Sequence, residues 1–339
     1  MQETFGIIGT IVDCHNDRDW DLRVQEQGLL VIDRNGKIVF RGIANDLKEA
    51  KAKYDFESVI ELEDKNEFLL PGFIDSHIHA AQYPNAGLGL DLPLLEWLNK
   101  YTFPMERRFG EDLQFAKRAY EAVVKSTLNH GTTTASYFAT IDVDASIILA
   151  EAAEEKGQRA FIGKVNMDRN GFERYEETTS DSLASTKSFV AAILNKKSNL
   201  VDPIITPRFL PTCTKHLLEE LGTLAKEKDI RIQTHLSECR PEVKWVSELE
   251  PWAKDYTDVY AQTGILTDKT ILAHGVYLND SELTIISDFK SGISHCPNSN
   301  NSIRSGNMDV VRYHETMPNL QIGKNLLQLS IEYRPGQPI

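Results

Sequence analysis

From Phe68 onward, short apolar segments typical of β-strands alternate with longer segments whose apolar residues recur at helical spacing. This alternation is typical of βα units around a parallel sheet. An eighth strand-like segment falls near residues 320–323, and the pattern is lost after it. We therefore predict an α/β fold, a TIM-barrel-like (β/α)8 barrel whose eighth βα unit is incomplete. The first seven predicted strands are residues 69–78, 132–137, 160–165, 203–206, 230–234, 270–273 and 292–294.

The first 68 residues follow a different pattern. Residues 4–12, 28–32 and 37–41 are rich in β-forming residue types, and residues 34–36 read Arg-Asn-Gly, a composition typical of a hairpin turn. A chain of 339 residues is long enough for one barrel of about 250 residues and a small module. We predict an N-terminal β module over residues 1–68, a barrel over 69–323 and an atypical tail over 324–339.

Charge and composition argue against several classes of partner. The net charge is −13, and no block of lysines and arginines is dense enough to follow a phosphate backbone. We therefore expect a small-molecule substrate, and neither nucleic acid nor membrane as partner. No segment approaches the roughly 18 apolar residues of a membrane span, and the N-terminus has no basic segment of a signal peptide, so a cytoplasmic location is expected. The four cysteines lie far apart, which predicts reduced thiols.

His77 and His79 lie at the end of the first predicted barrel strand. A spacing of two on a strand places both imidazoles on one face, so both can bind one metal ion. His235 and His274 end the fifth and sixth predicted strands, and barrel enzymes place their chemistry at these strand ends. Such a nitrogen-rich set suits zinc or iron and leaves a position open for water. The alternative for His77 and His79 alone is a pair of half-exposed histidines.

Glu238 follows His235 by three residues, just beyond the strand end. A carboxylate at this point can reach a substrate on the metal and transfer protons to and from it. The alternative is a surface or helix-capping glutamate, because Pro241 indicates that a helix begins there. Two other histidines are assigned different roles: His130, before Gly131, is expected to cap a helix, and His295 to shape the pocket from the seventh strand.

The long segment after the first strand carries the most specific signal. It contains HAAQY at 79–83, DLPLLEWL at 91–98 and YTFPME at 101–106. Further motifs are PRF at 207–209, HLSE at 235–238, AHGV at 273–276 and HCPNSN at 295–300. Together these residues resemble the amidohydrolase superfamily of metal-dependent hydrolases and, within it, the guanine deaminase family. The resemblance covers about residues 5–323.

The resemblance implies a metal site and two catalytic residues. By it, His77, His79 and His235 bind one zinc ion per subunit, His274 contacts the water on the metal, and Glu238 is the proton shuttle. The implied reaction is zinc-dependent hydrolytic deamination of guanine to xanthine and ammonia, carried out by a homodimer.

The resemblance also implies a guanine-binding site. The residues implied to bind guanine are Gln82, Arg208, Phe209, His235 and Glu238. The residue types agree with this assignment: the aromatic face of Phe209 can stack on a planar base, and Gln82 and Arg208 offer polar groups for its edge. Without the surrounding motif, these three would be ordinary loop residues.

The sequence departs from the family pattern after the eighth predicted strand. The family has an aspartate there that binds the metal and acts as base, whereas here residues 320–323 are followed by Lys-Asn-Leu-Leu. The only acidic residue after Glu315 is Glu332. Because loss of such a carboxylate lowers activity by orders of magnitude, three interpretations stay open. They are a working guanine deaminase of which this is a truncated form, a non-catalytic purine- or subunit-binding relative, and an amidohydrolase acting on another heterocycle.

Overall fold

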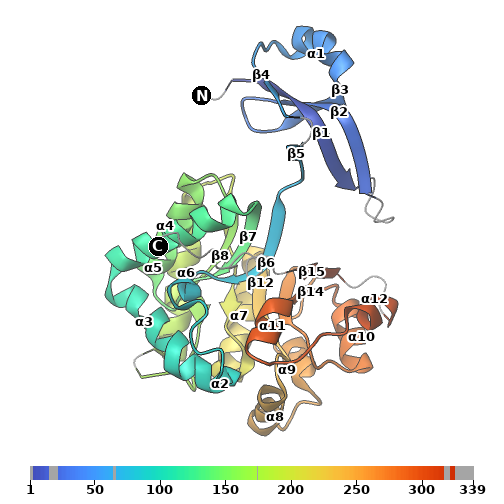
Figure 1. Ribbon diagram of the computed structural model, residues 1–339. Coiled ribbons are helices and arrows are strands. Elements are labelled where there is room, and N and C mark those ends of the chain that lie inside the picture. Colours follow the sequence, from blue (N-terminus) through green and yellow to red (C-terminus); the bar gives the residue numbers. More distant parts are fainter. Residues whose placement is uncertain (1–2, 15–21, 64–65, 174, 317–320, 325–339) are drawn as a thin grey trace. The chain divides into compact units, whose positions relative to one another are not determined.

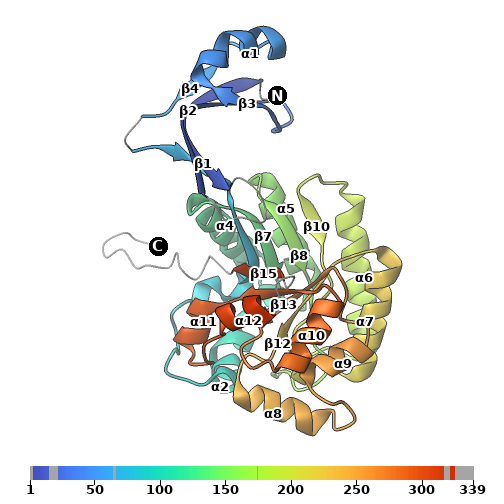
Figure 2. The same cartoon turned by 90° about the vertical axis from the view of Figure 1, so that its right-hand side faces the viewer.

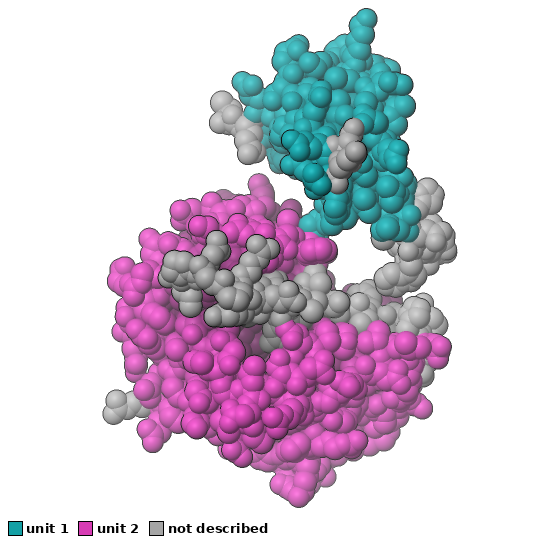
Figure 3. Space-filling view, viewed as in Figure 1, with its two compact units in different colours: residues 1–72 teal, residues 73–339 magenta. Residues whose placement is uncertain are grey.

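The computed structural model describes residues 3–14, 22–63, 66–173, 175–316 and 321–324 (Figure 1). The chain divides into two compact units, residues 1–72 and 73–339, which Figure 3 shows in teal and magenta. Apart from residue 324, the predicted tail over 324–339 lies outside the described residues.

The first unit is a small, mainly β structure. β1 (Phe5–Cys14), β2 (Leu22–Ile32) and β3 (Ile38–Ile43) are antiparallel, and they overlap the three strands predicted from the sequence. β4 (Val59–Glu61) and β5 (Phe68–Leu69) run parallel to β1. The sequence did not predict η1 (Ala44–Asp46) and α1 (Leu47–Tyr54). The helix contributes Ala50 to a small core with Leu29, Val31 and Phe56.

The second unit is a barrel of parallel strands. Within the described residues, eight strand positions follow one another around it. They are β6 (Phe73–His79), β7 (Thr132–Phe138), β8 (Arg159–Gly163) with β9 (Val165–Asn166), β10 (Val201–Pro203) with β11 (Thr206–Pro207), β12 (Ile232–Leu236), β13 (Thr270–His274), β14 (Gly292–His295) and β15 (Gln321–Lys324). The α/β barrel prediction is thus confirmed, with the third and fourth strands each interrupted.

The strand pairing shows how the ring is formed. β6, β7, β8 and β10 are neighbours, β9 pairs with β11, and a parallel bridge between Ile205 and Ile232 joins this half to β12. β12, β13, β14 and β15 form the other half. The predicted eighth strand is present as β15, which pairs with β14 and lies beside β6. The chain after β15 lies outside the described residues.

Helices cover the outside of the barrel, and Figure 2 shows α5, α6 and α7 side by side there. Among the described residues no helix is long and apolar enough to cross a membrane. The helices after the first loop are α4 (Leu113–Asn129), α5 (Val143–Glu155), α6 (Thr179–Asn195), α7 (Lys215–Lys228), α8 (Arg240–Leu249), α9 (Tyr256–Gln262), α10 (Asp280–Asp288), α11 (Pro297–Ser302) and α12 (Val310–Thr316), with the short η4 (Leu210–Thr212) after β11.

α4 illustrates why these segments are helical. Its apolar stripe buries Tyr120 and Val123 against the barrel, and the Asp112 side chain accepts a hydrogen bond from the first turn. His130 follows the last residue of the helix, and its Nδ1 lies 2.7 Å from the carbonyl oxygen of Ser126, as expected for a cap. Gly131 then turns the chain with a φ of 87°, a conformation that favours glycine.

The loop after β6 is long and folds over the strand ends. It forms η2 (Ala80–Asn85), α2 (Leu94–Trp97), η3 (Leu98–Thr102) and α3 (Phe103–Glu111). The motifs that carry the family resemblance over residues 79–106 therefore form the wall of the region above the strand ends. This region is where barrel enzymes place their chemistry.

Candidate metal centre and substrate cavity

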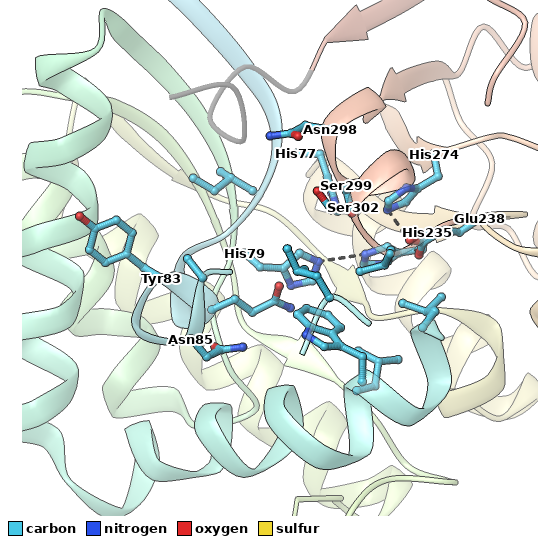
Figure 4. A pocket seen from close by; sticks show the side chains of 18 of the residues that line it. His77, His79, Tyr83, Asn85, His235, Glu238, His274, Asn298, Ser299 and Ser302 are labelled. Atoms are coloured by element: carbon cyan, nitrogen blue, oxygen red, sulfur yellow. Dashed lines mark hydrogen bonds and ion pairs between the residues drawn. The ribbon is translucent and has the colours of Figure 1, made fainter. Parts of the chain in front are cut away.

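Three histidines meet at the strand ends of the second unit (Figure 4). His77 and His79 come from β6 and His235 from β12, and their ligand nitrogens all lie within 4.8 Å of one another. Nε2 of His79 and Nε2 of His235 are 3.0 Å apart. Side chains separated by 156 residues in sequence therefore converge on one point, where they can hold a single metal ion.

Hydrogen bonding and burial prepare His235 for metal binding. Its Nδ1 lies 2.6 Å from the carbonyl oxygen of Arg208, which can only accept, so Nδ1 carries the proton and Nε2 offers its lone pair. Burial, together with the neighbouring imidazoles, holds the pKa of His77 and of His235 well below the usual range. Both rings are therefore neutral, which is the form that binds a metal.

His274, at the end of β13, faces the same site. Its Nδ1 is 2.8 Å from Oδ1 of Asn300, so Nδ1 donates and Nε2 is directed toward Glu238, 3.5 Å from a carboxylate oxygen. Burial lowers the pKa of His274 to about 4. The residue has a φ of 75°, an unfavourable conformation for a residue other than glycine, of the kind found at functional sites.

Cys296 also lies near His77 and His274, and the potential ligand atoms of these three residues are all within 4.8 Å of one another. Its thiol donates a hydrogen bond to the carbonyl oxygen of Ser294, and burial raises its pKa. A protonated thiol is a poor ligand, so this second group is a weaker candidate for a metal than the three histidines.

Glu238 lies just beyond β12 and is buried. Burial raises its pKa to about 7, while a hydrogen bond from the Ser305 hydroxyl to its Oε1, at 3.1 Å, acts in the opposite direction. A carboxyl group with a pKa near neutral can both donate and accept a proton. The alternative role of helix cap falls to Glu242, which accepts hydrogen bonds from the backbone nitrogens of Glu238 and Cys239 at the start of α8.

One cavity of about 270 Å³ brings the site together. The sequence-predicted residues that line it are His77, His79, Gln82, Arg208, Phe209, His235, Glu238 and His274. Gln82 comes from η2, and Arg208 and Phe209 follow β11. The Phe209 ring lies 6.4 Å from that of His235, so a planar base on Phe209 would lie next to the metal centre. His295 does not line the cavity; Asn298, Ser299 and Ser302 of α11 do.

Sequence reasoning assigned no role to Glu106, although it ends the YTFPME motif. Its carboxylate is fully buried and binds Arg208, and the hydroxyl of Tyr175 donates to it at 2.7 Å. Nε2 of Gln82 also donates to it, at 3.3 Å. Glu106 therefore organises the polar wall of the cavity, and the motif itself was the only signal that could have indicated it.

The barrel fold, with three histidines that could hold a metal ion at the strand ends, is that of the metal-dependent hydrolases of the barrel class. Residues 68–316 match the model of the amidohydrolase family. Guanine deaminase of Dictyostelium discoideum is 46% identical over 329 residues, which are 94% of this chain and 72% of that protein. The chain belongs to the amidohydrolase family and, within it, to the guanine deaminases.

Two further comparisons agree with this assignment. Guanine deaminase of Homo sapiens is 46% identical over 306 residues, covering 89% of this chain and 66% of that protein. The crystal structure of guanine deaminase from C. acetobutylicum with bound guanine in the active site has a TM-score of 0.88 and 31% identity, covering 96% of this chain and 75% of that one. This chain thus spans between 66% and 75% of the length of these three relatives.

Proposed function

We propose that this chain catalyses the hydrolytic deamination of guanine to xanthine and ammonia at a zinc ion held by His77, His79 and His235. The observation that carries the proposal is the group of three histidines, two of them buried, that lines one cavity with Glu238, whose pKa is raised to about 7. The guanine bound in the active site of the C. acetobutylicum relative supports guanine as the substrate.

The donor set fits zinc. Three imidazole nitrogens converge, and the second nitrogen of His235 already donates to a carbonyl, as is usual for histidines that bind zinc. When bound, zinc supplies a water molecule whose pKa is lowered toward neutrality. The nitrogen-only set suits zinc better than the hard cations calcium and magnesium, which prefer oxygen ligands.

The residues of the chain bind the base and move the protons. Phe209 stacks on the purine, and Gln82 and Arg208 bind its polar edge. Because Glu106 already balances the charge of Arg208, the site suits a neutral base. Protonated Glu238 donates to the ring nitrogen next to the carbon that carries the amine, which offsets the charge that develops as water adds to that carbon.

Glu238 and His274 complete the proton transfers. After its donation, Glu238 is a carboxylate that can accept one proton from the adding water and pass it to the amine, which leaves as ammonia. Glu238 then takes the remaining hydroxyl proton as the oxo group of xanthine forms, which restores its protonated form. His274 is neutral at physiological pH and its Nδ1 proton is bound by Asn300, so its Nε2 can accept a hydrogen bond from that water. Atoms balance: one water enters, and xanthine and ammonia leave.

The test is turnover by the purified, zinc-loaded chain, followed as xanthine and ammonia formed from guanine. We expect turnover that is lost in His77→Ala and Glu238→Gln. His216→Ala, on the exposed face of α7, is the matched control and should keep wild-type activity. Zinc binding without xanthine formation would contradict the proposed activity.

The second candidate is purine binding without catalysis. The family-like ligand set includes an aspartate after the eighth strand, and the 339 residues contain no aspartate after Asp309. Calorimetry with guanine distinguishes the two candidates, since binding heat without xanthine would favour this one. Turnover of a different heterocycle in the same assay would favour an amidohydrolase of other specificity.

Three further features stay predictions. A homodimeric state and a cytoplasmic location are proposed from the family resemblance and the composition, and light scattering and cell fractionation test them. The domain boundaries after residues 68 and 323 are proposed from the sequence pattern. Limited proteolysis, with mass spectrometry of the fragments, tests whether cleavage occurs there.

A further inference from the structure

The cavity of about 270 Å³ that contains the three histidines is also lined by a polar side chain whose hydrogen-bonding groups have no partner among the described residues. Asn85 is 2% exposed, and neither its Nδ2 nor its Oδ1 has a partner among the residues that the structure describes. The residue lines the same cavity as the three histidines. Burying an amide without partners is unfavourable, so an unpaired amide in a cavity wall points to a ligand that supplies the missing partner.

The local structure explains why Asn85 faces the cavity. It ends η2, the short 3₁₀-helix that directly follows His79. Residues three apart eclipse one another in a 3₁₀-helix, so Asn85 lies on the same face as Gln82. Figure 4 shows the Asn85 side chain extending toward the space below His79, whereas the ring of Tyr83 points to the other side. Two amides from one helix face therefore border the cavity.

The two amides are in different situations. Nε2 of Gln82 already donates to Glu106, at 3.3 Å, which leaves its oxygen available as an acceptor. Asn85 has both its N–H donors and its oxygen available, within the described part of the chain. Asn85 is therefore the residue of this pair that can donate to an acceptor on the ligand.

The position of η2 indicates which ligand edge it meets. Glu238 follows β12 and His274 ends β13, and Figure 4 shows both on the opposite side of the cavity from Asn85. In the proposed reaction the carbon that loses its amine faces Glu238, so the remote edge of the base faces η2. In guanine this edge carries the 6-oxo oxygen and N7, both of which only accept hydrogen bonds.

We propose that Asn85 is a specificity-determining residue that donates a hydrogen bond from Nδ2 to the 6-oxo oxygen of the purine. The orientation of the base in this inference rests on the proposed function. Asn85 would thereby favour 6-oxopurines over purines that lack the oxygen. The side chain has no hydrogen-bond partner in the described part of the chain. Its role is therefore to bind the ligand and not to stabilise the loop.

The test measures binding and needs no turnover. Hypoxanthine has the 6-oxo group and purine lacks it, and neither carries the amine that is lost in deamination. We would measure both dissociation constants by calorimetry on the zinc-loaded chain. Wild type should bind hypoxanthine more tightly than purine, and Asn85→Ala should weaken hypoxanthine binding about three- to tenfold while leaving purine binding nearly unchanged. Asn129→Ala, exposed at the end of α4, is the matched control.

Stability separates recognition from a structural role. Removing a buried amide that has no partner should leave the Tm of the ligand-free chain unchanged or raise it. Asn85→Leu, which keeps the shape without polar atoms, should give the same binding pattern. Three results would overturn the inference. They are an equal loss of affinity for hypoxanthine and purine in the variants, a lowered Tm together with such an equal loss, and a wild type that binds hypoxanthine no more tightly than purine. Absent guanine turnover with the expected binding pattern would overturn the proposed function alone.

Discussion

The carboxylate of Glu106 accepts two hydrogen bonds from the guanidinium of Arg208, at 2.6 and 3.0 Å, and both side chains are almost completely buried. The same carboxylate binds Gln82 and Tyr175. One acidic residue thus fixes two of the residues proposed to bind the purine. The net stabilisation of such a pair is small, but a partner left alone is a buried, uncompensated charge.

Glu106→Gln should therefore lower stability and substrate affinity together. Loss of the charge leaves Arg208 unbalanced, and breaking a buried pair costs about 3–5 kcal/mol in free energy of unfolding. A misplaced guanidinium should raise the KM for guanine more than it lowers kcat, because Arg208 binds the base and moves no proton. Urea unfolding and steady-state kinetics measure the two effects. Glu111→Gln, in an exposed pair with Arg107, should change little, and equal behaviour of the two variants would contradict the prediction.

The pH dependence of stability should reveal Glu242. Burial, followed by the charge of Glu238, raises the pKa of Glu242 to about 7 from an ordinary value of 4.5. The folded state therefore holds a proton that the unfolded state releases, so this contribution to stability is fully present below pH 4.5 and is lost as the pH rises through 7.

The test compares the free energy of unfolding of the metal-free wild type with that of Glu242→Gln between pH 5 and 8. The stability of wild type relative to the variant should fall as the pH rises, in urea unfolding followed by circular dichroism. Glu248→Gln, on the exposed face of α8, should follow the wild-type curve. Parallel curves for wild type and Glu242→Gln would show that Glu242 does not titrate in this range.

The sequence predicted the barrel, and it singled out the three histidines of the proposed metal site, because both depend on local pattern. A histidine that ends an apolar strand faces the catalytic end of any parallel barrel, whatever the remaining contacts are. The breaks between β8 and β9 and between β10 and β11 could not be predicted, since they leave no mark on the apolar pattern. Glu106 and Asn85 received no role for another reason: the Glu106–Arg208 contact spans 102 residues, and the Asn85 amide is notable only for contacts that it lacks.

Asn300 should act on catalysis through His274. By accepting from Nδ1 at 2.8 Å, it fixes the tautomer that leaves Nε2 facing Glu238. Asn300→Ala should lower kcat for guanine about 10- to 100-fold, as for other partners that orient metal-site histidines. The pH profile should change as well, because the hydrogen bond that His274 donates to Asn300 raises the pKa of His274 against the effect of burial. Asn301→Ala, exposed on the same helix, should leave kcat and the profile unchanged.

Removal of the metal should lower the Tm, and this zinc-dependent difference in Tm should depend on each of the three histidines. A ligand that binds only the folded state stabilises it by an amount that grows with its concentration, about 4 kcal/mol at a thousand times Kd. Chelation should therefore lower the Tm of wild type, and added zinc should restore it. In His77→Ala, His79→Ala and His235→Ala the zinc-dependent shift should shrink or vanish, whereas His216→Ala should retain it. A full shift in any of the three variants would remove that histidine from the metal site, and calorimetric zinc titration would check the same point independently of unfolding.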